Sequence, residues 1–264
     1  MGVEHRYIEV NGLRLHAVDF GGAGAPIVCL HDVGGHAWAW RGVAAALEGR
    51  RRLLAVDLRG HGDSQWSAAQ GYETKDLALD LSAALSTSSE PVDVVGAGWG
   101  GLVGLVAASA SPSLFRRLVM VDSPPSSRQS TGDVPAAPAE FDHYAAVVDW
   151  ERRANPRASD ATLDTLASLG TRPGAEGRFV RKHDPYFGWR WPFSADDHWV
   201  ALQSLQVTAL AVRGEQSHVL TSADFDRMAT VQPQLQRAVI AAAGHHVALD
   251  NPVGVAQALV DFLS

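Results

Sequence analysis

Val94-Val95-Gly96-Ala97-Gly98-Trp99-Gly100-Gly101 is the stretch that decides the fold of this chain. Its apolar, β-branched start is typical of a buried strand, and the glycines that follow predict a sharp turn into a helix. The stretch matches the motif G-x-S-x-G, the nucleophile elbow, at every position except the middle one, where Gly98 stands. The serine of that motif attacks a carbonyl carbon, and glycine has no side chain with which to attack. The stretch therefore predicts an elbow that lacks its nucleophile.

Apolar runs and helical patterns alternate on both sides of this stretch. We expect strands near residues 26–30, 52–56, 92–95, 118–121, 207–212 and 238–242, and helices near 38–47, 74–85, 102–110, 223–231 and 253–263. Two alternating runs, 6–10 and 14–20, flank Asn11-Gly12 and predict an N-terminal hairpin. Strand–helix alternation implies a mostly parallel central sheet flanked by helices on both faces.

The alternation stops between residues 123 and 206, a segment rich in Pro, Ser, Trp and charged residues. We interpret this segment as an inserted helical cap, and residues 1–122 and 207–264 as one α/β core. The active sites of such sheets lie beyond the carboxyl ends of the strands, so the cap is expected to cover that edge.

Charge and hydropathy restrict the partners of the chain. Its 264 residues carry a net charge of -7, which argues against nucleic acid and anionic membranes as partners. The N-terminal residues lack the apolar core of a signal peptide, and no apolar stretch approaches the roughly 20 residues that span a bilayer. We expect a cytoplasmic monomer or homodimer that binds a small-molecule substrate or ligand.

Three further segments add to the elbow. They are the loop Leu30-His31-Asp32-Val33-Gly34-Gly35, the turn Asp57-Leu58-Arg59-Gly60-His61-Gly62-Asp63-Ser64, and Gly244-His245 followed by Asp250-Asn251-Pro252. Together, in this order and spacing, the four segments resemble the α/β-hydrolase superfamily of capped esterases, epoxide hydrolases and C–C hydrolases. The resemblance covers nearly the whole chain, is weakest across the cap, and implies the α/β-hydrolase fold. The chain departs from the pattern at Gly98 and at Asp32, which replaces the first glycine of the H-G-x-x-G oxyanion loop.

The resemblance implies most of a catalytic site. His245 matches the catalytic histidine, and the backbone N–H groups of Val33 and Trp99 match the oxyanion hole. The acid that orients the histidine is not identified by the motif. The position where relatives carry it is Ser217 or His218 here, and neither residue is acidic.

Two carboxylates could take over the role of the acid. Asp122 follows the strand after the elbow, where some superfamily members carry the acid, and we favour it as the partner of His245. Glu215 is the alternative, although in relatives that position usually points away from the histidine.

A histidine oriented by an aspartate is a general base near neutral pH and needs no serine. We therefore expect a non-acyl-enzyme reaction on a small, apolar or aromatic carbonyl or hydroxyl compound: a lyase, cyclase, cofactor-free oxygenase or water-activating hydrolase. The His245 and Asp122 pair is also similar to that of cofactor-independent dioxygenases. Two alternatives remain open: an inactive protein that binds a small molecule or a partner, and a serine hydrolase whose serine was replaced by engineering at Gly98.

Polar and aromatic residues near the oxyanion loop and in the cap are candidates for binding the substrate, although many of them could simply pack the cap onto the sheet. The candidates are Asp32, His36, Trp38, His143, Tyr144, Trp150, Trp189 and Trp191. The histidines show neither H-x-x-x-H nor H-E-x-x-H spacing, so we expect no metal site and no cofactor.

Overall fold

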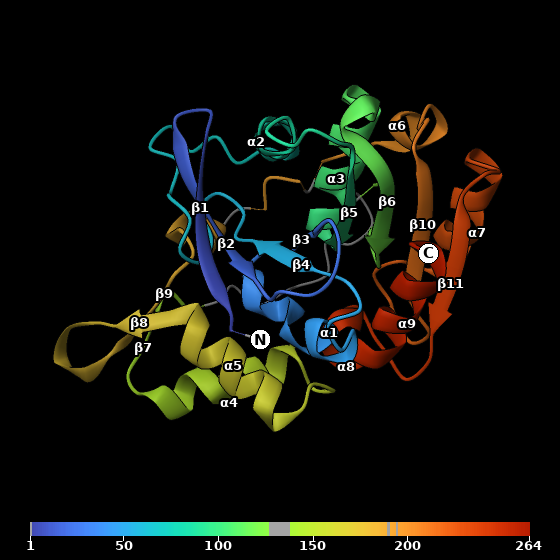
Figure 1. Cartoon of the computed structure of the whole chain (residues 1–264). Helices are drawn as coiled ribbons and strands as arrows, with labels where there is room; N and C mark the ends of the chain where they lie inside the picture. The colour runs from blue at the N-terminus through green and yellow to red at the C-terminus, as the bar shows by residue number, and fades with distance from the viewer. Residues whose placement is uncertain (1, 127–137, 189–190, 194) are drawn as a thin grey trace.

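The core of the molecule is an eight-stranded sheet (Figure 1). The computed structural model describes residues 2–126, 138–188, 191–193 and 195–264. In spatial order the strands are β1 (Glu4–Val10), β2 (Leu13–Asp19), β4 (Leu53–Val56), β3 (Ile27–Leu30), β5 (Val92–Ala97), β6 (Phe115–Val121), β10 (Thr208–Gly214) and β11 (Gln236–Ile240). The β1–β2 and β2–β4 pairs are antiparallel and the other neighbours are parallel. The prediction of a mostly parallel sheet is confirmed.

The N-terminal hairpin turns at Asn11 and Gly12. Their φ angles are +49° and +75°, so both residues lie in the left-handed region. A two-residue turn of this kind matches the twist of the flanking strands, and Asn-Gly adopts it most readily. The turn sets the β1–β2 register, in which Val10 pairs with Leu13.

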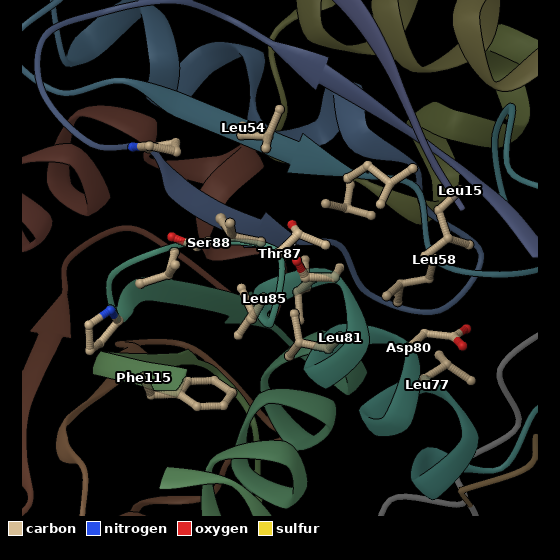
Figure 2. A pocket seen from close by; sticks show the side chains of 18 of the residues that line it. Leu15, Leu54, Leu58, Leu77, Asp80, Leu81, Leu85, Thr87, Ser88 and Phe115 are labelled. Carbon is tan, nitrogen blue, oxygen red and sulfur yellow. Dashed lines mark hydrogen bonds between the residues drawn. The ribbon is translucent and has the colours of Figure 1, made fainter. Parts of the chain in front are cut away.

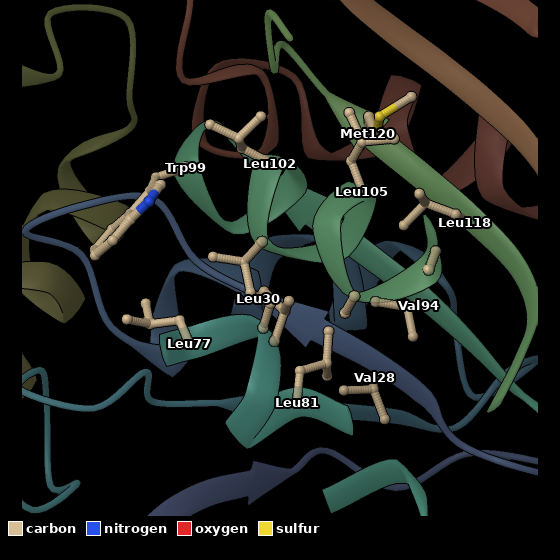
Figure 3. Packing of buried hydrophobic residues seen from close by; sticks show 14 of the residues in the cluster. Val28, Leu30, Leu77, Leu81, Val94, Trp99, Leu102, Leu105, Leu118 and Met120 are labelled. Atoms are coloured by element: carbon tan, nitrogen blue, oxygen red, sulfur yellow. The ribbon is translucent and has the colours of Figure 1, made fainter. Parts of the chain in front are cut away.

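Helices cover both faces of the sheet (Figure 1). One face carries α2 (Thr74–Leu85), α3 (Trp99–Ala110) and α7 (Ser222–Val231), and the other carries α1 (Arg41–Ala46), α8 (Val247–Asp250) and α9 (Pro252–Phe262). Leucines of α2 and α3 pack onto the apolar side chains of β3 and β5 (Figure 3). Within the described residues, no helix is both long and apolar enough to cross a lipid bilayer.

The segment between β6 and β10 contains α4 (Tyr144–Ala154), α5 (Asp160–Gly170) and α6 (Trp199–Gln203). It also contains a small sheet of β7 (Glu140–Phe141), β9 (Phe179–Arg181) and β8 (Thr171–Pro173), which the sequence did not predict. Strands of two or three residues are too short to give a readable alternation of apolar and polar positions. Helices α4 and α5 and this sheet form a lobe at one side of the core (Figure 1).

Candidate active site

The turn between β5 and α3 has no side chain at its central position, Gly98. Gly98 joins β5 to α3 with φ +50° and ψ -118°, a conformation that residues with side chains rarely adopt. Around it the strand, the helix and the preceding loop are in close contact. A Cβ atom at Gly100, for example, would lie 2.5 Å from the carbonyl oxygen of His31. Glycine at position 100 therefore lets the first turn of α3 lie close to the loop that follows β3.

The carboxylate of Asp32 occupies the space beside Gly98. A Cβ atom at position 98 would lie 2.2 Å from Cγ of Asp32 and 2.3 Å from both of its carboxylate oxygens. The two departures from the motifs, Asp32 and Gly98, therefore fit each other. A serine hydrolase altered only at position 98 does not account for this fit, because a serine there would collide with Asp32.

Both backbone N–H groups expected to form the oxyanion hole donate to Asp32. The Val33 and Trp99 nitrogens lie 2.8 and 2.7 Å from Oδ1 of Asp32. The two donors that the resemblance assigns to the oxyanion hole are thus both bonded to a side chain of this protein. The indole of Trp99 is buried; its ring packs against Phe187 and Phe193, and its N–H donates to Thr74 Oγ1. Figure 3 shows it directed away from the leucines of α3.

His245 lies between two carboxylates. Its Nε2 is 2.9 Å from Oδ2 of Asp32, and its Nδ1 is 2.8 Å from Oδ2 of Asp122. The side chains of His245 and Asp32 are 25% and 20% exposed, whereas that of Asp122 is fully buried. Asp32, which we expected only as a substrate contact, is thus placed where a nucleophile would stand.

Asp122 is held by several groups at the end of β6. Its φ of +50° is unusual for a residue with a side chain, and strain of this kind is concentrated at functional sites. Its Oδ1 accepts a hydrogen bond from the Gly214 N–H (3.1 Å), and its Oδ2 accepts one from the hydroxyl of Ser217 (2.5 Å). Glu215, the alternative acid, instead accepts a hydrogen bond from the Ala242 N–H.

The two carboxylates change the proton affinity of the histidine. Burial lowers the pKa of His245, but hydrogen bonds to Asp122 and Asp32 outweigh it and raise the pKa to about 10. Burial raises the pKa of Asp32, but the bond to His245 and the nearby charges lower it to about 2. At neutral pH His245 is therefore an imidazolium.

His246 also lies beside the triad of Asp32, His245 and Asp122. Its Nδ1 donates to Oδ1 of Asn155, 2.5 Å away. Burial and the charge of His245 lower the pKa of His246 to about 4, so it is neutral at neutral pH. Asp32, His245 and His246 each offer one potential metal-ligand atom, and these atoms lie within 4.8 Å of one another. Asp32 is remote in sequence, so no histidine-spacing motif could have revealed the group.

Two of the predicted substrate contacts lie beside the oxyanion loop but face other elements. The Nε2 of buried His36 is 3.2 Å from the Leu166 carbonyl oxygen of α5. Trp38 packs edge-on against Phe20, with ring centroids 5.6 Å apart. Both are structural contacts in this conformation.

The predicted cap residues that the structure describes contact other residues of the segment between β6 and β10. His143 caps α4, the hydroxyl of Tyr144 donates to Asp164, and Trp150 stacks on the Arg181 guanidinium, 3.8 Å from the ring centroid. The ring of Trp191 packs edge-on against Phe193, which contacts Trp99. Trp189 lies outside the described residues.

A cavity of about 450 Å³ lies away from the triad, between α2 and the strands of one sheet face (Figure 2). Its lining is mostly apolar and includes Leu15, Leu54, Leu58, Leu77, Leu81, Leu85 and Phe115. None of the three triad residues lines it.

The order and direction of the strands agree with the comparison to known families. A model of the alpha/beta hydrolase fold matches residues 25–252. The chain belongs to the α/β-hydrolase family. The fold expected from the four sequence segments is therefore confirmed.

Relatives of the chain are hydrolases. A soluble epoxide hydrolase from Corynebacterium sp. is 34% identical over 124 residues, which are 47% of this chain and only 43% of that protein. A 2-hydroxy-6-oxo-2,4-heptadienoate hydrolase from Pseudomonas putida is 26% identical over 98% of this chain and 96% of its own length. The solved thioesterase domain from the curacin biosynthetic pathway has a TM-score of 0.87 at 21% identity, over 99% of this chain and 100% of that domain, and shows the fold alone.

Proposed function

We propose that the chain is a hydrolase whose nucleophile is the carboxylate of Asp32, acting on a small apolar molecule with an electrophilic saturated carbon. One observation carries the proposal: the carboxylate fills the elbow, with Oδ1 on both backbone donors and Oδ2 on His245. A carboxylate nucleophile forms a covalent ester, which splits one difficult substitution into two easier steps.

In the first step Oδ2 of Asp32 attacks the carbon and forms a C–O bond, while the bond from that carbon to its leaving group breaks. The leaving group departs with the electron pair. Asp32 becomes a neutral ester, so His245 loses one of its two carboxylate partners and its pKa falls. The proton on Nε2 then passes to solvent, which leaves His245 able to act as a base.

In the second step His245, oriented by Asp122, takes a proton from water, and the hydroxide attacks Cγ of the ester. Negative charge develops on Oδ1, which the Val33 and Trp99 N–H groups already contact. Such preorganised donors are worth roughly 3–4 kcal/mol each in the transition state. The Cγ–O bond to the substrate breaks, the alkoxide takes the proton from His245, and the new carboxylic acid returns a proton to His245. For an alkyl halide the sum is R–X plus water giving R–OH, X⁻ and H⁺. For an epoxide the leaving oxygen stays in the same molecule and takes up the proton that His245 releases, so the sum is epoxide plus water giving a diol.

This mechanism retains the expected base chemistry of His245 and Asp122 but changes the substrate class. A carbonyl substrate would need the oxyanion hole, and the carboxylate of Asp32 lies in it. An epoxide or an alkyl halide needs no such hole in the first step. The similarity to an epoxide hydrolase supports this choice.

Turnover in water enriched in heavy oxygen tests the proposal. The probes are terminal epoxides, styrene oxide and bromoalkanes, assayed with chelator present. Attack of water on the ester places one heavy oxygen in Asp32, so mass spectrometry of the peptide that contains residue 32 should show the label after several turnovers. Label in the product alone would overturn the proposal and favour direct activation of water by His245 and Asp122. Binding of these probes without turnover would favour a binding protein.

A further inference from the structure

Three side chains beside the elbow form a group that the hydrolytic mechanism uses only in part. Asp32, His245 and His246 each offer one ligand atom, all within 4.8 Å of one another. A carboxylate and two imidazoles are ligands that Zn²⁺ and similar ions accept, and three protein ligands leave one position open for water. His246 has no role in the two chemical steps.

The outer contacts of both histidines are those of metal ligands. Nδ1 of His245 donates to Asp122, and Nδ1 of His246 donates to Oδ1 of Asn155. Metal-binding histidines almost always donate the second ring N–H to a carboxylate or carbonyl oxygen, which fixes the ring and its tautomer. In each ring Nε2 is the nitrogen that is not bonded to Asp122 or Asn155, and Nε2 of His245 already meets Asp32.

The distances are close to those that one ion requires. Two ligands about 2.1 Å from a tetrahedral zinc ion are roughly 3.4 Å apart. The Asp32–His245 pair, at 2.9 Å, is already near this spacing. The ligand atom of His246 lies within 4.8 Å of the other two. All three residues lie in loops or at a helix end.

We propose that a divalent transition ion of the zinc type binds Asp32, His245 and His246. Coordination replaces the proton that Nε2 of His245 shares with Asp32 and releases it to solvent. The bound ion occupies the carboxylate that would attack the substrate, so it is a reversible inhibitor. The inhibition rests on the proposed function, whereas the binding does not.

Isothermal titration of the chelator-treated protein with zinc chloride tests the site directly. We expect one zinc ion per chain, and at least a tenfold weaker Kd for His246→Gln. The exposed His218 provides the matched control, and His218→Gln should bind as the unaltered protein does. Asn155→Leu should weaken zinc binding tenfold or more, and Asn155→Asp should bind zinc as the unaltered protein does. A purely structural role of Asn155 would not produce this difference between the two variants.

Two results would overturn the metal site: no saturable binding at millimolar zinc, or equal affinities for His246→Gln and the unaltered protein. Heat of binding is read without substrate, and the heavy-oxygen experiment is run with chelator. Failure of the metal site and failure of the Asp32 nucleophile are therefore seen separately. If the metal site and the Asp32 nucleophile are both correct, half-maximal inhibition of turnover should occur at a zinc concentration near the Kd for zinc. Excess chelator should then restore turnover.

Discussion

At the scale of single residues, Gly98 and Asp32 form one feature of the active site. Loss of the elbow serine alone would leave an empty oxyanion hole beside His245. Instead the Asp32 carboxylate reaches the same place from the neighbouring loop and meets both backbone donors. The missing side chain at position 98 is therefore a requirement for the position of Asp32, because any Cβ there would overlap its carboxylate.

Asp32→Asn tests the nucleophile with little change in shape. An amide oxygen can still accept from Val33 and Trp99, but a carboxamide does not attack a saturated carbon. We expect single-turnover rates to fall by roughly 10⁴-fold or more, in the range seen when a nucleophile is removed. Rapid-quench kinetics on an epoxide or bromoalkane probe measures this. A rate within tenfold of the unaltered enzyme would contradict the nucleophilic role.

The fit between positions 32 and 98 predicts strong coupling between substitutions. Gly98→Ser alone should lower the unfolding free energy, because its Cβ overlaps Asp32. Asp32→Gly in the same chain removes the overlap and frees the two N–H groups, so the double variant should recover about 1–3 kcal/mol relative to additivity. Urea denaturation of the four proteins measures the coupling.

The same double variant should gain esterase activity on p-nitrophenyl acetate, because the introduced serine, His245 and Asp122 would form a serine triad. The Asp32→Gly single variant is the control and should lack this activity. Additive stabilities together with an inactive double variant would show that the two positions are independent.

The charge state of His245 is open to direct measurement. Its pKa of about 10 reflects bonds to Asp122 and Asp32 that outweigh burial. Nitrogen NMR of labelled histidine should therefore show an imidazolium at pH 8. In Asp32→Asn the pKa should fall by at least one unit, since one carboxylate is gone and each unit is about 1.4 kcal/mol. A neutral His245 at pH 8 in the unaltered protein would contradict the charge assignment.

At the scale of elements, glycines let the elbow helix lie against its neighbours. Gly100→Ala would place Cβ 2.5 Å from the His31 carbonyl oxygen, a backbone atom, so the start of α3 must move and carry the Trp99 N–H away from Asp32. We expect a loss of about 1–3 kcal/mol of stability and slower turnover. Gly104→Ala, on the same helix, meets only the end of the Leu118 side chain at 2.9 Å and is the milder control. Equal effects on turnover would show that α3 does not position the site.

The elements that the sequence predicted best are those set by local patterns. Asn11-Gly12 predicted the turn of the β1–β2 hairpin, and the short apolar runs predicted the parallel strands. The expected partner of His245, Asp122, was inferred from its place after a strand, and the structure brings the two together. The small sheet of β7, β9 and β8 was missed because its strands are too short for periodicity.

The position of the Asp32 carboxylate could not be predicted in the same way. Its bond to the Trp99 N–H spans 67 positions in the sequence and depends on how the loop after β3 meets α3. In the sequence, Asp32 and Gly98 are two separate departures from two motifs. Only their three-dimensional proximity shows that one compensates for the other.

At the scale of the whole molecule, segments far apart in the sequence are tied to the site. Asn155, at the end of α4, binds His246, and Asp184 accepts a hydrogen bond from the hydroxyl of Tyr72. The Asp184 N–H also donates to the carbonyl oxygen of Gly60. The segment between β6 and β10 therefore holds His246 beside the triad through Asn155 and is tied to the core through Asp184.

Buried histidines of two opposite kinds should give the molecule a stability maximum near pH 6.5. The native pKa of His245 lies above the unfolded value, so its contribution is complete below pH 6.5 and is lost as pH rises through 10. Burial lowers the pKa of a second set, whose contribution is lost as pH falls below 6.5, because the unfolded chain then binds more protons. These are His31, His36, His61, His183 and His246.

Urea denaturation at pH 5, 6.5, 8 and 9.5 separates the two limbs of this profile. We expect the unfolding free energy to fall on both sides of pH 6.5, by on the order of 3 kcal/mol toward pH 9.5. His36→Gln should flatten the acid limb, because a neutral amide replaces one buried imidazole that must remain unprotonated. Asp32→Asn should flatten the alkaline limb, because His245 then begins from a lower native pKa. If Asp32→Asn leaves the alkaline limb unchanged, the Asp32–His245 ion pair does not contribute to folding, and the charge arrangement on which the first chemical step depends is wrong.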